Sequence, residues 1–132
     1  SVCCNTLAQA NLFVQADPTR LERINAFMEE EADYTGNVEV KHFLTLLQEL
    51  GTEKISEVVK QPLSGLKVAC YYGCLLLRPQ SVGIDDSEQP SILETIMESI
   101  GAEPTFFPYQ VECCGSYHTV VKPEIVARRA YL

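Results

Sequence analysis

Residues 66–79 read LKVACYYGCLLLRP, and this stretch decides the fold prediction. Its first half is apolar, rich in β-branched and aromatic residues and bounded by glycines, which is typical of a buried strand over 66–72. Further on, apolar residues recur with helical spacing over 92–100, and the aromatic residues of 104–111 predict a second strand. A strand, a helix and a strand in this order predict a parallel pair of strands.

Helical signals dominate the chain on either side of this unit. Before it, apolar spacing predicts helices over residues 3–14, 18–31 and 40–50, followed by a short helix that Thr52 would cap. Asp17 is expected as the N-cap of the second helix, with Pro18 at its first position. Ser91 and Glu94 form a capping-box pattern for the helix between the strands, and Pro123 opens a last helix. The predicted fold class is therefore α/β, with a helical N-terminal portion followed by a βαβα unit with parallel strands.

Composition and charge exclude several functions. The chain has 132 residues and a formal net charge of −8, which disfavours binding to a nucleic acid backbone or to an anionic membrane surface. No run approaches the roughly 20 apolar residues that a membrane span needs, so we expect no direct membrane insertion. The N-terminus has no pattern typical of a signal peptide, and we expect a cytoplasmic location. The chain has no initiator methionine, and we interpret it as an excised piece of a longer protein.

Six cysteines need a chemical explanation, and they fall in three motifs. The motifs are Cys3-Cys4 at the start of a predicted helix, Cys70 to Cys74 across the end of the first predicted strand, and Cys113-Cys114-Gly115 after the second. Thiolates are the ligands that iron–sulfur clusters use, and the spacings for a mononuclear zinc site are not present. Because ligands gather at the carboxyl ends of parallel strands, we expect the loops of Cys74 and Cys113 to meet.

These motifs resemble a known family. Residues 68–79 (VACYYGCLLLRP) followed by CCG at 113–115 are similar to the cysteine-rich CCG domain family, with 38 residues between Cys74 and Cys113. The family includes the B subunit of heterodisulfide reductase and subunits of fumarate reductases and succinate dehydrogenases. Its pattern is one cysteine, Cys-Cys-Gly after a long gap, and a closing Cys-x-x-Cys. The resemblance implies that 66–132 begins a second copy of this repeat, and that 1–65 holds the end of the first copy and a linker.

The resemblance also implies a ligand set. Cys74, Cys113 and Cys114 match the family's first cysteine and its pair, and Cys3 matches the last ligand of the preceding copy. Each intact copy would bind a noncubane [4Fe-4S] cluster, with the remaining ligands outside this chain, so that the fragment itself would hold no cluster. Cys4 falls at a position that is usually aromatic in the family.

The function implied is that of an oxidoreductase subunit. Electrons would arrive from partner iron–sulfur or flavin subunits and reduce a disulfide of the CoM-S-S-CoB type at the cluster. One alternative is a structural zinc or assembly domain of a quinone- or fumarate-linked respiratory complex, without catalysis of its own. Another is a redox-sensing dithiol, with a Cys113–Cys114 or an interloop disulfide and no metal.

Three further residues each allow two interpretations. Cys70 lies in the predicted strand and is either a packed core thiol or a ligand. His118 follows the Cys-Cys-Gly motif and either donates protons to a departing thiolate or is an ordinary loop histidine. Arg78 either neutralises an anionic cluster or substrate, or simply begins a surface loop before Pro79.

Overall fold

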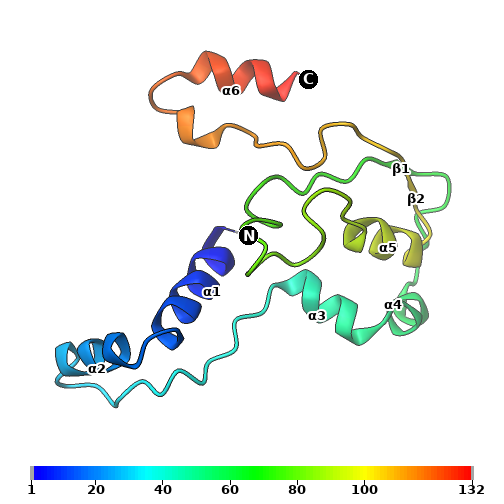
Figure 1. The fold of residues 1–132 in the computed structure, drawn as a ribbon. Coiled ribbons are helices and arrows are strands. Elements are labelled where there is room, and N and C mark those ends of the chain that lie inside the picture. Colours follow the sequence, from blue (N-terminus) through cyan, green and yellow to red (C-terminus); the bar gives the residue numbers. More distant parts are fainter. Residues whose placement is uncertain (1, 132) are drawn as a thin grey trace. The chain divides into compact units, whose positions relative to one another are not determined.

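A short parallel pair of strands organises the C-terminal part of the chain in the computed structural model, which describes residues 2–131. Strand β1 (Lys67–Val68) pairs with β2 (Glu103–Pro104), with Lys67 opposite Glu103 and Val68 opposite Pro104 (Figure 1). Helix α5 (Ile92–Ser99) lies between them in the sequence. The predicted strand–helix–strand order and the parallel pairing are confirmed.

Both strands are shorter than predicted, and a turn in the second segment interrupts its pairing with the first. Phe107 accepts a backbone hydrogen bond from Gln110 at 3.2 Å, with Pro108 at the second position of this turn. Proline favours that position because its φ is already fixed near the value required. The prediction of a strand over 104–111 is therefore wrong beyond residue 104, and the first strand ends at Val68, well before residue 72.

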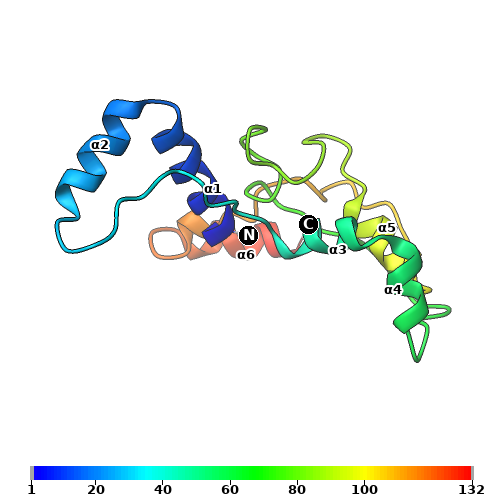
Figure 2. The ribbon, with the colours of Figure 1, turned by 90° about the horizontal axis from the view of Figure 1, so that it is seen from below.

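The core of this part of the chain lies between α5 and the residues around Cys74. Its best-buried members are six side chains that form one cluster: Cys70, Tyr72, Leu76, Leu77, Ile92 and Ile96. Helices α3 (Phe43–Leu50) and α4 (Thr52–Val58) also pack against α5, and α4 and α5 lie side by side in Figure 2. The segment that follows β1 is thereby fixed by its own apolar side chains, since Leu77 is only 1% exposed.

The start of α5 differs from the predicted capping box. Ser91 occupies the N-cap position, but its side chain makes no capping hydrogen bond. The carboxylate of Asp85 instead accepts hydrogen bonds from the backbone N–H groups of Ser91 (2.6 Å) and Ile92 (2.7 Å). Glu94 does not reach back to the N-cap either, because its carboxylate accepts a hydrogen bond from the hydroxyl group of Tyr72.

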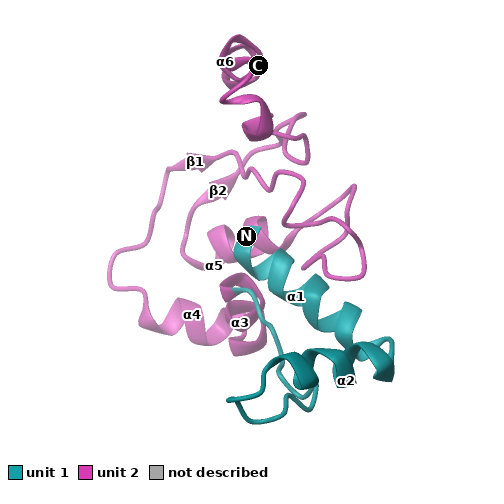
Figure 3. Ribbon diagram, turned by 90° about the vertical axis from the view of Figure 1, so that its left-hand side faces the viewer, with its two compact units in different colours: residues 1–42 teal, residues 43–132 magenta. Residues whose placement is uncertain are grey.

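The chain divides into two compact units, residues 1–42 and 43–132, coloured separately in Figure 3. In the first unit, helix α1 (Val2–Gln15) packs against α2 (Pro18–Phe27), whose predicted cap is confirmed, since Asp17 accepts from the N–H of Thr19 at 2.9 Å. Helix α2 ends four residues before the predicted residue 31, because the glutamates at 29–31 would face the negative end of the helix dipole. Asn25 holds the returning segment through two hydrogen bonds with the backbone of Tyr34.

The remaining elements follow the second strand. A 3-10 turn, η1 (Ser116–His118), precedes helix α6 (Pro123–Ala130), which begins at the predicted proline.

The two helices before the first strand begin later than predicted or are capped differently. The helix predicted over 40–50 begins only at Phe43. Thr52 is the first residue of α4, and Gly51 occupies its N-cap position. None of the helices described is both long enough and apolar enough to cross a membrane.

We predict that Asp85, and not Ser91, stabilises the start of α5. Asp85→Ala should lower the free energy of unfolding by about 1–2 kcal/mol, the usual cost of removing a helix cap. Ser91→Ala is the matched control and should cost much less, because its hydroxyl makes no capping bond. Urea denaturation followed by circular dichroism measures both, and a larger loss for Ser91→Ala would contradict the assignment.

Candidate cysteine site

Two loops that follow the paired strands meet through backbone hydrogen bonds. The carbonyl oxygen of Gln110 accepts from the N–H groups of both Tyr72 (2.8 Å) and Gly73 (3.1 Å). The hydroxyl of Tyr71 donates to the carbonyl oxygen of Glu112 at 2.7 Å. These contacts lie immediately before Cys74 in one loop and before Cys113 in the other, so they bring the two cysteine segments side by side.

Cys74 begins a turn that its neighbours anchor in the core. Its carbonyl oxygen accepts from the N–H of Leu77 (3.3 Å) and of Arg78 (2.9 Å), and the Leu77 side chain is buried. The thiol of Cys74 is half-buried and close enough to Cys113 for that residue to influence its ionisation. Burial, and then the hydrogen bond and the charge of Cys113, raise the pKa of Cys74 above its usual value. The predicted meeting of the two loops is confirmed.

The Cys113-Cys114-Gly115 segment turns sharply at its glycine. Gly115 has φ +77°, a left-handed conformation that side chains disfavour, and its N–H donates to the sulfur of Cys113 at 3.4 Å. Cys114 is exposed, and hydrogen bonds from the Ser116 hydroxyl and backbone N–H lower its pKa. Ser116 therefore favours the thiolate form of Cys114, which is the form that binds metals and attacks electrophiles.

A cavity of about 330 Å³ opens beside this cysteine pair. Tyr71, Phe107 and Tyr109 form an aromatic wall, with Phe107 and Tyr109 in edge-to-face contact at 5.9 Å between ring centroids. Arg129 of α6 also lines the cavity and forms an ion pair with Glu112 at 3.2 Å. The cysteine pair therefore faces a mostly apolar space that holds one cation and one carboxylate.

Three of the four predicted ligands come together, and the fourth belongs to the other unit. Cys113 and Cys114 line one cavity, and the loop of Cys74 is hydrogen-bonded to theirs through Gln110, while Cys3 is an exposed residue of α1. Cys4 is half-buried on the same helix. The ligand roles of all of these cysteines remain predictions.

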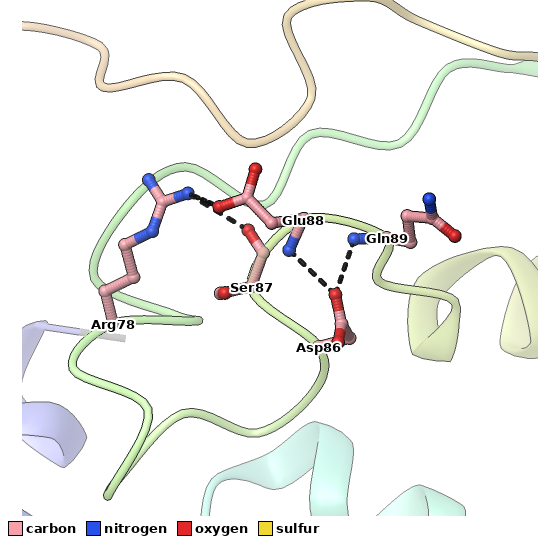
Figure 4. A network of polar contacts seen from close by, with 5 residues as sticks. All are labelled: Arg78, Asp86, Ser87, Glu88 and Gln89. Atoms are coloured by element: carbon pink, nitrogen blue, oxygen red, sulfur yellow. Dashed lines mark hydrogen bonds and ion pairs between the residues drawn. The ribbon is translucent and has the colours of Figure 1, made fainter.

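The two candidate catalytic residues have other surroundings. Arg78 forms an ion pair with Glu88 at 2.6 Å and donates to the carbonyl oxygen of Ser87, in the polar loop drawn in Figure 4. In the same loop, Asp86 accepts from the backbone N–H of Glu88. His118 is exposed on η1 and is not among the described residues that line the cavity. Their catalytic roles remain predictions.

Cys70 has the environment of a core residue. Its side chain is 5% exposed, belongs to the core cluster and lies beside Glu94. Burial, and then the nearby Glu94 carboxylate, raise the pKa of its thiol to about 11. A thiol that is so reluctant to ionise is a poor metal ligand, which favours the reading of Cys70 as a packed thiol.

The donors that meet at this site are sulfur atoms. Among residues 2–131, no group of three or more His, Cys, Asp or Glu side chains is arranged to hold one metal ion. A multi-iron cluster binds its cysteines at different iron atoms, so its ligands need not converge on one point. Three soft sulfur donors from two loops therefore fit part of an iron–sulfur ligand set.

Comparison with known families identifies the domain to which both cysteine loops belong. Residues 68–131 match the sequence profile of the cysteine-rich domain family CCG. This half of the chain belongs to the CCG family. The match begins at the end of β1 and includes both cysteine loops, the aromatic wall and α6. The CCG domain is thus the part of the chain that builds the site.

Curated relatives extend the similarity over most of the chain. The chain is 35% identical over 131 residues to the 8-methylmenaquinol:fumarate reductase membrane anchor subunit of Wolinella succinogenes. It is 32% identical over 117 residues to the B subunit of the ferredoxin:CoB-CoM heterodisulfide reductase of Methanosarcina mazei. It is 30% identical to a protein of Archaeoglobus profundus that is described as similar to the heterodisulfide reductase B subunit. The alignments cover 98%, 86% and 86% of this chain. The chain spans 45%, 39% and 40% of these relatives' own lengths, which is less than half.

Two side chains of the CCG domain's site do not follow from the sequence motifs. Tyr71 is expected from the sequence only as a packing and hydrogen-bonding residue, and Arg129 lies outside all three cysteine motifs. The sequence could have indicated Arg129. It lies on one face of α6 with Val126 and Ala130, at positions i, i+3 and i+4, and all three line the cavity. No sequence pattern indicates that Tyr71 would face the cysteines.

We predict the relative reactivity of three thiols, those of Cys114, Cys74 and Cys70, in the metal-free protein. Cys114 should react with iodoacetamide first, because it is exposed and its lowered pKa provides more thiolate at a given pH. Cys74 should follow, with its rate still rising at a pH where that of Cys114 has levelled off, since its pKa is raised. Cys70 should react last. Mass spectrometry of timed samples checks the order, and labelling of Cys74 before Cys114 would contradict it.

Proposed function

We propose that Cys74, Cys113 and Cys114 are ligands of a noncubane [4Fe-4S] cluster in the whole protein, and that this protein is an oxidoreductase subunit. The observation that carries the proposal is that the loops of Cys74 and Cys113, which follow parallel strands, are joined by two backbone hydrogen bonds to the carbonyl oxygen of Gln110. Membership of residues 68–131 in the CCG family and the similarity to the heterodisulfide reductase B subunit support it.

The proposal includes a division of the chain into repeats. Residues 66–132 would open one cysteine-rich repeat, and residues 1–65 would close the preceding repeat and link the two. Cys3 would then be the last ligand of that preceding copy. The remaining ligands of each site would come from parts of the protein outside this chain, so the chain by itself would bind no complete cluster.

The chemistry proposed is the reduction of a disulfide. A bound cluster would supply electrons one at a time, and the two sulfur atoms of the substrate take up two electrons and two protons to become two thiols. His118 is exposed to solvent and would provide a proton to a departing thiolate. Arg78 would attract an anionic substrate, in exchange for its ion pair with Glu88.

The substrate and partners proposed rest on the relatives' names. A disulfide of the CoM-S-S-CoB type is proposed because one relative described above belongs to a CoB-CoM heterodisulfide reductase and another is similar to such a subunit. Electrons would arrive from a partner iron–sulfur or flavin subunit of a larger complex. The aromatic cavity beside Cys113 and Cys114 would keep water away from the reacting sulfur atoms.

A second candidate function rests on the relative from Wolinella succinogenes. That protein is the membrane anchor subunit of a fumarate reductase, and the alignment covers 98% of this chain. The domain would then serve assembly in a quinone- or fumarate-linked complex, with its cysteines on a structural zinc. Zinc needs four ligands in tetrahedral geometry, so the three cysteines of the two loops would have to rearrange around the ion and gain a fourth ligand.

The metal content of the full-length protein, purified without oxygen, tests the proposal. About four irons with matching acid-labile sulfide per intact repeat are expected. Cys74→Ala, Cys113→Ala and Cys114→Ala should each lose most of this iron, because each removes a ligand. Cys70→Ala is the matched control and should keep it, because Cys70 is a core thiol.

The outcomes separate the candidates. Zinc without sulfide would overturn the cluster proposal and support the assembly function. A disulfide between Cys74 and Cys113 or between Cys113 and Cys114, with no metal bound, would instead indicate a redox-sensing dithiol. Loss of iron in Cys70→Ala with the fold intact would move Cys70 into the ligand set.

A further inference from the structure

The cavity beside the cysteine pair leaves aromatic surface in contact with water. Tyr71 and Tyr109, which line it, are 45% and 41% exposed. The ring of Phe107 lies 6.5 Å from that of Tyr71 and 5.9 Å from that of Tyr109, centroid to centroid. Burial of such surface is favourable, and a further ring gains from edge-to-face contacts with these three. With a volume of about 330 Å³, the cavity has room for a small aromatic molecule.

Arg129 adds a positive charge to this apolar space. Among the described residues that line the cavity it is the only cation, and it shares a face of α6 with Val126 and Ala130. Its side chain passes close to the turn of the Cys-Cys-Gly motif, since a Cβ atom built on Gly115 would lie 4.0 Å from the Arg129 Cγ atom. The turn therefore supports the aliphatic part of the side chain beside the cysteine pair.

The present partner of Arg129 can be exchanged. Its Nη1 atom forms an ion pair with the Glu112 carboxylate at 3.2 Å, and the two side chains are 43% and 53% exposed. Water screens the attraction in an exposed pair of this kind, so the pair holds its members only weakly. A guanidinium group binds a well-placed carboxylate through two parallel hydrogen bonds, which is a stronger arrangement. A carboxylate that enters the cavity can thus replace Glu112 at little cost.

We propose that this cavity binds a small aromatic carboxylate, whose carboxylate group replaces Glu112 as the partner of Arg129. The aromatic body packs against the wall formed by Tyr71, Phe107 and Tyr109. An apolar cavity alone accepts many molecules, and an exposed arginine alone attracts many anions, but the two together select a molecule that carries both groups. The inference goes beyond the proposed function, since it requires neither a metal at the cysteines nor a redox reaction.

Titration calorimetry of the full-length protein, purified without oxygen, tests the inference with naphthoate and its neutral amide, naphthamide. Naphthoate should bind more tightly, because only its carboxylate can pair with Arg129. Arg129→Gln should weaken naphthoate binding about tenfold, the effect of losing a charged hydrogen bond, and should leave naphthamide binding unchanged. Arg128→Gln is the matched control, since it removes the same charge from the neighbouring position of α6, outside the described lining of the cavity. It should leave the binding of both probes unchanged.

Three further variants keep the test decisive if Arg129→Gln fails to fold. Glu112→Gln should tighten naphthoate binding, because the competing carboxylate is gone while Arg129 remains. Ala130→Phe places a ring in the cavity and should abolish the binding of both probes. Ala127→Phe is its control, on the same helix but outside the described lining, and should bind both as the wild type does.

Several outcomes would overturn the inference. They are no binding of naphthoate to the wild-type protein, equal binding of naphthoate and naphthamide, and an equal loss in Arg128→Gln and Arg129→Gln. Weaker naphthoate binding in Glu112→Gln, or binding that survives in Ala130→Phe, would also contradict it. None of these results depends on the metal content of the protein, so a failure here leaves the proposed function as it stands.

Discussion

The carbonyl oxygen of Gln110 accepts two backbone hydrogen bonds, and the arrangement of the cysteine site depends on them. The paired strands are two residues long, too short to align the loops that follow them. The Gln110 contacts with Tyr72 and Gly73 continue the pairing beyond the turn at Pro108, and the Tyr71–Glu112 bond adds a third contact. Each bond contributes only about 1 kcal/mol, so the site relies on their combination with the buried leucines after Cys74.

Local signals in the sequence are sufficient for much of the fold. Asp17 and Pro18 locate the start of α2, and the apolar spacing that ends at Gly101 locates α5. The order of elements predicts the parallel pair, and the rule that ligands gather at strand ends predicts the meeting of Cys74 with Cys113. These predictions need only nearest neighbours in the chain and the general geometry of a strand–helix–strand unit.

The predictions that the structure does not confirm concern contacts between residues far apart in the sequence. The Ser91–Glu94 pattern is that of a capping box. In the structure, however, the Glu94 carboxylate accepts a hydrogen bond from the Tyr72 hydroxyl, and Asp85 accepts the backbone hydrogen bond at the start of the helix. The aromatic residues near Pro108 suggest a strand, but that proline opens a turn. Tyr71 and Tyr72 are adjacent residues of the same type. Only the folded chain shows that Tyr71 lines the cavity beside the cysteines and that Tyr72 lies in the core.

The central claim is that the two loops joined at Gln110 hold iron through Cys74, Cys113 and Cys114. The most direct measurement is a pair of anomalous difference maps recorded at the iron and zinc absorption edges, from crystals of the full-length protein grown without oxygen. The account predicts iron peaks bonded to all three sulfur atoms. A single zinc peak at these cysteines, or iron bound elsewhere with all three thiols uncoordinated, would contradict it.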